Sequence, residues 1–373
     1  MMYLIAILLV LVVICYLYNK KRYTTWKRLN VPGPEPLFLF GNMRKVAMLQ
    51  ASITDTYDEI YRKFPDCKYV GIYVMDRPAI LLRDPEVIED VLVKNFSNFH
   101  DNDLEVKIEH DPVFGNNPFV LRADVWKTKR TQHLLSLTPA KVKVMLPELE
   151  SCANRMVAYL QMQIEKNGST CCMESLELAA RYTTETVTAV GVNINSNSFS
   201  DSTPELRNAG RAIFEPGLMR SIKLYLVFLI PKITSIISLT MMPKSLIEKY
   251  KGLILQTLKY RAENNIRKDD FFDHLQEFRG ERQSLDEMTA QLGGLYIDGF
   301  GTNSGALNFI VYHIAAHQDI QEKLRQEIQE YLERNDGKLT ADVVLEMPYL
   351  DAVFCGDVLN FTLCQKHVRM HRS

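Results

Sequence analysis

The chain has 373 residues, enough for one large or two smaller hydrophobic cores, and its 47% hydrophobic content excludes a largely disordered protein. Lys and Arg number 44 against 45 Asp and Glu, for a net charge of -1. Proteins that bind nucleic acid usually have an excess of basic residues or a basic surface stripe, so we expect no nucleic-acid partner.

The amino-terminal segment is predicted to be a membrane anchor. Residues 2–18 are almost all apolar, which at about 1.5 Å per residue just spans a hydrocarbon core. Positive charge follows at residues 20–22 and none precedes the segment, so the body is expected on the cytosolic side. A cleaved signal peptide is the alternative, but residues 16–20 offer no small-residue cleavage site. We therefore expect a single-pass anchor at residues 1–18.

The next segment, residues 19–45, has the composition of a basic and proline-rich linker. Its centre reads V-P-G-P-E-P at residues 31–36, where each proline fixes φ and removes an N–H donor. We expect a stiff, non-helical spacer.

A small β-sheet is predicted next. Residues 68–73 and 79–82 are short strand candidates, joined by a turn at residues 75–78. Asp84 then has the pattern of an N-cap followed by Pro85 in the first helical position, which predicts a helix through about residue 93.

Beyond this point the pattern is helical. Residues 140–165 and 172–190 carry apolar side chains three and four positions apart, as amphipathic helices do. Residues 224–242 are hydrophobic but interrupted at Pro231, so a second spanning helix is not expected. Burial in the core and a surface region that dips into a bilayer remain alternatives for this segment.

The clearest helix is predicted at residues 284–317. Ser284 and Glu287 form a capping box, and an apolar stripe continues from there. The segment D-G-F-G-T at residues 298–302 lies inside this helix, where glycines cost stability and need a packing or functional reason. Further helices are expected at residues 318–334 and from Pro348 to about residue 355.

Residues 295–304 also imitate the strand, G-x-G-x-x-small turn and helix of a dinucleotide-binding enzyme, with Asp319 downstream. The capping box and the stripe favour a helix instead, and no βαβ series follows. The sequence has no G-x-S-x-G and no H-E-x-x-H motif, so a hydrolase is not expected.

These pieces, in this order, resemble the microsomal cytochrome P-450 family across about residues 1–355. The resemblance is carried by the anchor and basic linker, P-G-P at residues 32–34, W-K-T-K-R at 126–130, G-F-G-T at 299–302 and M-P-Y-L-D-A-V at 347–353. It implies a mainly α fold with a small β-sheet near the N-terminus, preceded by one transmembrane helix. Residues 46–355 would form a partial haem-thiolate monooxygenase domain.

The resemblance implies that Trp126 and Arg130 bind the haem. They are four residues apart, so one helical face can offer an indole N–H and a guanidinium to the two propionates. Unpaired buried charge is costly, which is why the propionates need such partners. Without the resemblance, a surface amphipathic turn would explain the same two residues.

The glycine segment is expected on the other side of the haem. Gly299 and Gly301 would thin the helix beside the cofactor, Thr302 would donate a hydrogen bond to the bound oxygen, and Asp298 would join a proton relay. An ordinary crossing of helices at small residues is the alternative. The sequence departs from the family at two positions, because the residue before the threonine is usually an acid and position 298 is more often alanine.

The resemblance ceases at residue 356. The family continues with a Glu-x-x-Arg pair, but Gly356 and Leu359 occupy those positions, and residues 356–373 are predicted to be a divergent tail. Cys355 and Cys364 lack the family's haem-cysteine loop, so no residue of this chain is expected to ligate the iron. The remaining cysteines are scattered without a C-x-x-C pair, as in reducing compartments: Cys15, Cys67, Cys152, Cys171 and Cys172.

The family's activity supplies the functional expectation. The chain would be the N-terminal part of a monooxygenase of the endoplasmic reticulum membrane that hydroxylates lipophilic small molecules, xenobiotic or endogenous. It would use dioxygen and electrons from an NADPH-dependent reductase. Because the haem-binding cysteine is missing, we expect the chain as written to be inactive and stable haem binding to be doubtful. An inert anchored isoform that binds a reductase or is degraded is the non-enzymatic alternative.

Overall fold

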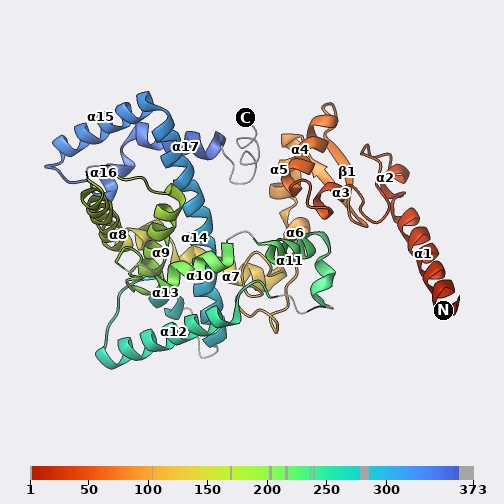
Figure 1. Cartoon of the computed structure of the whole chain (residues 1–373), viewed down its shortest axis with the longest axis horizontal. Coiled ribbons are helices and arrows are strands. Elements are labelled where there is room, and N and C mark those ends of the chain that lie inside the picture. Colours follow the sequence, from red (N-terminus) through yellow and green to blue (C-terminus); the bar gives the residue numbers. More distant parts are fainter. Residues whose placement is uncertain are drawn as a thin grey trace. The chain divides into compact units, whose positions relative to one another are not determined.

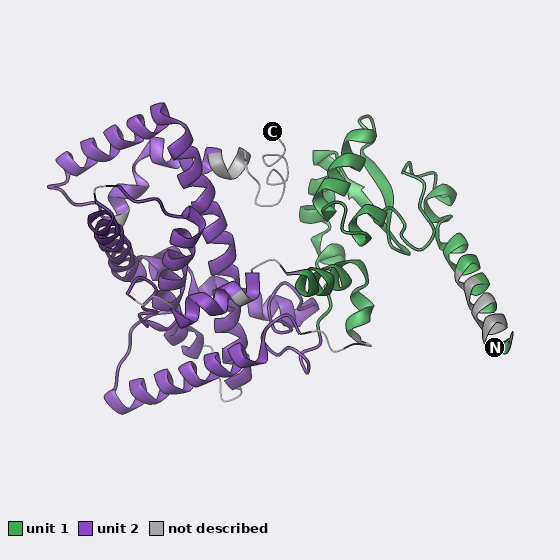
Figure 2. Ribbon diagram, viewed as in Figure 1, with its two compact units in different colours: residues 1–106, 218–238 green, residues 107–217, 239–373 purple. Residues whose placement is uncertain are grey.

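The computed structural model describes residues 2–102, 104–168, 170–200, 204–214, 217–235, 237, 240–277 and 285–360. The chain forms two compact units (Figures 1 and 2). Unit 1 contains residues 1–106 and 218–238, and unit 2 contains residues 107–217 and 239–373. In the described part, the chain is mainly helical with a two-stranded sheet, as the sequence predicts.

Unit 1 holds the N-terminal elements and one later insertion. Its elements are α1 (Met2–Arg22), α2 (Thr25–Arg28), α3 (Arg44–Ala47), α4 (Ile53–Lys63), β1 (Tyr69–Val74), β2 (Arg77–Leu82), α5 (Pro85–Glu89), the π-helix η1 (Asp90–Lys94), α6 (Phe96–Phe99), α11 (Leu218–Leu229) and the 3-10 helix η2 (Pro231–Ser235). Its core lies under the sheet and is made by Met43, Val46, Ile60, Val70, Ile72, Val74 and Leu229.

The predicted sheet and the helix after it are confirmed. Strands β1 and β2 pair antiparallel, with Tyr69 opposite Leu82 at one end of the ladder. The Asp84 carboxylate accepts the backbone N–H of Glu86 at 2.9 Å and of Val87 at 3.2 Å, so it caps α5 as expected. The sequence does not reveal that the last turn before Asn95 widens into a π-helix.

The N-terminal helix extends past the predicted anchor, because α1 ends only at Arg22. Among the described residues, the structure has no helix long and apolar enough to cross a membrane. The anchor predicted at residues 1–18 is therefore not confirmed. Residues 31–36 form neither helix nor strand, as predicted for the spacer, and the carbonyl of Pro32 accepts the N–H of Gly71 at 2.8 Å.

Unit 2 is helical throughout its described part. Its helices are α7 (Ala123–Ser136), α8 (Pro139–Lys166), α9 (Ser175–Val192), α10 (Glu205–Phe214), α12 (Lys244–Asn264), α13 (Phe271–Glu277), α14 (Leu285–Ala316), α15 (Gln318–Arg334), α16 (Ala341–Leu345) and α17 (Pro348–Asn360). The helices predicted at residues 140–165, 172–190 and 318–334 are confirmed within three residues at each end. Ser284 of the predicted capping box and residues 361–373 of the predicted tail, with Cys364, lie outside the described residues.

The long helix α14 is the axis of unit 2 (Figure 1). It continues through residues 295–304 without a break, which excludes the strand and turn of a dinucleotide-binding site. Its rings of Tyr296 and Phe300 stack at a centroid distance of 5.4 Å in a core with Met242, Leu246 and Tyr250. A second core surrounds Phe271, Phe272, Met288 and Leu292 toward the start of the helix.

The hydrophobic stretch at residues 224–242 is divided between exposed and buried side chains. Helix α11 ends at Leu229 and the 3-10 helix starts at Pro231, so the proline interrupts the helix as predicted. Val227 and Leu229 are buried, whereas Phe228 between them is 42% exposed. Part of the segment therefore belongs to the core of unit 1.

Candidate functional site

Two of the predicted site residues lie on α7. Trp126 is half-buried and Arg130 is exposed, and their spacing of four places both on one side of the helix. Helix α7 begins after Arg122 without a side-chain cap. In the described part of the chain, the Arg130 guanidinium forms no hydrogen bond and no ion pair.

Helix α7 lies along the first half of α14. Lys129 Nζ is 3.3 Å from the carboxylate of Glu287, and the side-chain amide of Gln291 donates to that of Gln132 at 3.2 Å. Further along α14, the positive charge of Arg130 acts on the carboxylate of Asp298. The structure thus brings the two predicted parts of the site, which are more than 160 positions apart in the sequence, onto facing surfaces.

The side chain of Asp298 on α14 is partly buried. Burial raises the pKa of its carboxyl to about 6, and the opposing effects of the Asn117 amide and of Arg130 are smaller. Asn117 comes from the loop before α7 and is 1% exposed. A carboxyl group with a pKa near 6 exchanges its proton readily at physiological pH, which is the property that acid–base chemistry requires.

Thr302 follows Asp298 by one helical turn. Its side chain is exposed, and its hydroxyl donates to the backbone carbonyl of Asp298 within the same helix. Such a bond is common for threonine in helices and leaves the hydroxyl oxygen able to accept a further hydrogen bond. Thr302 and Asp298 therefore share one side of α14.

The two glycines of the segment lie where other helices approach. A Cβ on Gly299 would meet Cγ2 of Val187 on α9 at 2.8 Å. A Cβ on Gly301 would meet the ring of Phe214 on α10 at 2.5 Å. These contacts supply the packing reason that glycines inside a helix require, and they correspond to the helix-crossing alternative.

His133 is a neighbour of the site that the sequence pattern does not single out. The pKa of its imidazole is lowered to about 4, mainly by burial and to a smaller extent by the charges of Arg130 and Lys129. Its ring meets that of Phe271 at 5.8 Å, edge to face. The only signal in the sequence is its position one turn after Arg130, which is too weak to identify it.

The described cysteines do not form a metal centre. Among the residues that the structure describes, no group of three or more His, Cys, Asp or Glu side chains could hold a metal ion. Cys152 is buried on α8, and burial raises the pKa of its thiol to about 11, which disfavours the thiolate. Cys355 is exposed on α17 and lies 3.7 Å from Asp351 of its own helix.

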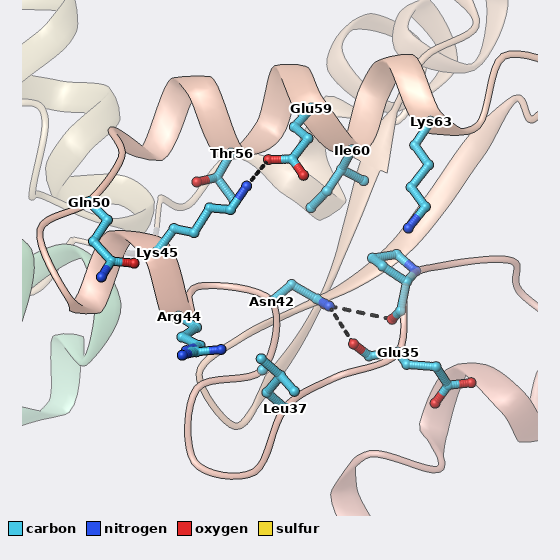
Figure 3. A pocket seen from close by; sticks show the side chains of 12 residues that line it. Glu35, Leu37, Asn42, Arg44, Lys45, Gln50, Thr56, Glu59, Ile60 and Lys63 are labelled. Carbon is cyan, nitrogen blue, oxygen red and sulfur yellow. Dashed lines mark hydrogen bonds and ion pairs between the residues drawn. The ribbon is translucent and has the colours of Figure 1, made fainter.

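Two surface hollows lie in different units of the chain. One, of about 330 Å³, is in unit 1 between the spacer and helices α3 and α4 (Figure 3). There Lys45 pairs with Glu59 at 2.6 Å, and the Asn42 amide donates to the carbonyls of Pro34 and Glu35. The other, of about 550 Å³, is in unit 2 between α9, α10 and α14.

The long central helix, the W-x-x-x-R helix beside it and the small N-terminal sheet define a mainly helical protein of the haem-monooxygenase type. The family model for cytochrome P450 matches residues 31–355, and the chain belongs to the cytochrome P450 family.

Curated relatives agree with this assignment. The chain is 32% identical to cytochrome P450 6k1 of Blattella germanica over 94% of its own length and 70% of that protein. It is 31% identical to cytochrome P450 6B7 of Helicoverpa armigera, over 95% of this chain and 71% of the relative. For cytochrome P450 6a2 of Drosophila melanogaster the identity is 30%, with 94% and 71% covered.

Membership in this family defines the general chemistry. It implies a haem cofactor with its iron, a monooxygenase reaction on xenobiotic or endogenous substrates that are lipophilic, and a reductase as redox partner. Arg130 fits one part of the haem, because its exposed guanidinium is not used by a protein carboxylate in the described chain and can receive a propionate. Cys152 does not fit the axial thiolate, because burial raises the pKa of its thiol to about 11.

Proposed function

We propose that this chain is the N-terminal part of a membrane-bound monooxygenase that hydroxylates lipophilic small molecules. The main support is the juxtaposition of α7 and α14, which sets Arg130 across from Asp298. Residues 46–355 would be the partial catalytic domain and residues 356–373 a divergent tail.

In this proposal α7 holds the propionate edge of the cofactor. The guanidinium of Arg130 would pair with one propionate, and the indole N–H of Trp126, one turn earlier, would donate to the other. When bound, the haem supplies the iron at which dioxygen is activated. Gly299 and Gly301 would keep α14 narrow beside the cofactor, while Val187 and Phe214 occupy the space that their side chains would take.

Asp298 and Thr302 would transfer protons on the side of α14 that faces α7. The raised pKa of Asp298, about 6, allows its carboxyl to hold a proton at neutral pH in part of the molecules and to release it to a neighbour. The Thr302 hydroxyl can accept that proton through one lone pair while donating its own hydrogen onward. In this structure the hydroxyl donates to the Asp298 carbonyl, and it would exchange this bond for another acceptor during proton transfer.

We also propose that neither Cys152 nor Cys355 is the axial ligand of the iron. The match to the family ends at residue 355, and the chain spans about 70% of the length of its curated relatives. The raised pKa of Cys152 and the exposed position of Cys355 support this. A reduced carbon-monoxide spectrum with the thiolate band would disprove this proposal.

The propionate roles are tested by titrating haem into the purified chain and following the haem absorbance. We expect Arg130→Gln to weaken binding by about tenfold, the loss of one charge-assisted hydrogen bond, and Trp126→Phe to weaken it by less. Lys127→Gln is the matched control, because it removes an exposed charge from the same helix. Equal effects of Arg130→Gln and Lys127→Gln would contradict the assignment.

Membrane attachment is the last part of the proposal. Helix α1 would hold the chain in the endoplasmic reticulum membrane, with the body in the cytosol where an NADPH-dependent reductase can reach it. The apolar sequence of residues 2–18 and the basic residues 20–22 that follow support this orientation. Extraction of microsomes at alkaline pH tests it, since an inserted chain stays in the pellet and a chain without residues 2–18 is released.

A further inference from the structure

The hollow in unit 2 lies on the side of α14 away from Asp298 and Thr302. Phe300 and Ser304 line it, and each is two positions beyond one of those residues, which on an α-helix places it on roughly the opposite face. The hollow has a volume of about 550 Å³, within the range of small-molecule pockets. The hollow includes neither Asp298 nor Thr302, and Gly301 is the one predicted site residue that lines it.

Apolar groups form much of its wall. The rings of Phe214 and Phe300 meet at a centroid distance of 5.4 Å, and Leu176 and Ala180 of α9 add aliphatic surface. Gly301 lies beneath Phe214, so the backbone of α14 itself is part of the lining. A surface of this kind receives a hydrocarbon or aromatic body.

The polar side of the hollow is an arginine with an unused donor. Arg207 is 7% exposed, its Nη2 pairs with the Glu177 carboxylate at 2.5 Å, and its guanidinium lies 5.5 Å from the Phe300 ring centre. Its Nε is buried and makes no hydrogen bond in the part of the chain that the structure describes. Buried donors are rarely left without an acceptor, so a ligand oxygen has a place here.

The Glu177 carboxylate is shared by two guanidinium groups, since Arg181 Nε also donates to it at 2.9 Å. Glu174 and Arg211 also line the hollow, so charges of both signs surround it. The feature that favours a ligand oxygen is the buried Nε of Arg207, which an anion beside it would satisfy.

We propose that this hollow binds an amphiphilic carboxylate, with its head at Arg207 and its apolar body between Phe214 and Phe300. The ligand is bound on the face of α14 opposite the catalytic side, so it is an accessory ligand and not the hydroxylated substrate. Because it contacts Gly301 and Phe300, its occupancy stiffens the middle of α14.

The test uses the full chain without haem and a dansyl-labelled undecanoic acid, whose fluorescence rises on binding. We expect Arg207→Gln to raise the Kd of the acid by about tenfold or more, the loss of a charge-assisted hydrogen bond, and to change the Kd of the methyl ester little. Arg181→Gln is the matched control, because it loses the same Glu177 partner but does not line the hollow. Its Kd for the acid should stay near that of the unaltered chain.

A second variant keeps the proposal testable if Arg207→Gln does not fold. Ser304→Leu fills the hollow from α14 without touching the ion pairs, and it should weaken both the acid and the ester. Equal affinity of the unaltered chain for acid and ester would overturn the proposal, as would unchanged binding in Arg207→Gln or in Ser304→Leu. The assay needs no haem, so its outcome is independent of the proposed monooxygenase.

Discussion

Replacing Asp298 by asparagine should stabilise the folded chain at neutral pH. The pKa of this carboxyl is about 6 in the folded chain and 3.8 in the unfolded one. The folded state therefore prefers the protonated acid, and the stability this preference gives is complete below pH 3.8 and is lost as the pH rises to about 6. Asparagine cannot ionise, so the variant avoids that loss.

The difference in pKa sets the size of the effect. At 1.36 kcal/mol for each pH unit, it corresponds to about 3 kcal/mol above pH 6, and partial exposure of the side chain reduces this to about 1–3 kcal/mol. At about pH 4 the expected gain falls to about 0.5 kcal/mol or less, because the folded state is then protonated and the unfolded state is only about half ionised. Urea unfolding followed by far-ultraviolet circular dichroism at both pH values measures it.

Asp269→Asn is the control for this experiment. This exposed carboxylate is bound by Arg267 at 2.6 Å, and that hydrogen bond lowers its pKa, so the same substitution should destabilise the chain at neutral pH. A gain for Asp298→Asn that is equal at both pH values would refute the reasoning, because it would show that the ionised carboxylate is not what costs stability.

Four further substitutions test the packing of unit 2. Glu327→Gln should destabilise the chain by about 1–3 kcal/mol and speed amide exchange at the start of α17, because the two carboxylate oxygens accept backbone N–H groups there at 2.8 Å each. Gly299→Ala should cost about 1–3 kcal/mol in urea unfolding, whereas Gly252→Ala, with no atom within 4 Å of the new Cβ, should gain about 0.5–1 kcal/mol. His133→Leu should raise the melting temperature more at about pH 5 than at neutral pH, because the pKa of His133 is lowered from 6.5 to about 4 and its stability contribution is lost as the pH falls between those values.

The sequence predicted the elements whose signals are local. Asp84 with Pro85 located the start of α5, and apolar spacing located α8, α9 and α15 within three residues. These signals work because a cap or an amphipathic stripe acts within one or two turns of the chain. The widened turn at Asp90–Lys94 has no such signal and was missed.

Contacts between distant segments could not be read in this way. The cap that Glu327 provides for α17 joins residues more than 20 positions apart, and the pair of Lys129 with Glu287 joins residues 158 apart. The resemblance to a family predicted that Arg130 and Asp298 lie near each other, and the charge of Arg130 does act on the Asp298 carboxyl, which local patterns alone could not predict. It did not identify His133, because its burial depends on Phe271 of a helix far along the chain.

Gly301 illustrates how the fold accounts for a departure from the family pattern. Other members usually carry an acid before the threonine, but here the ring of Phe214 fills the space that any side chain would need. An acid would have to displace that ring, which lies tilted against Phe300 at a centroid distance of 5.4 Å. The carboxyl group nearest to Thr302 on the same helix is instead Asp298, one turn earlier, where Asn117 and Arg130 partly offset its burial. The loss of an acid at one position and the gain of one at another are thus consistent with a single rearrangement of packing around α14.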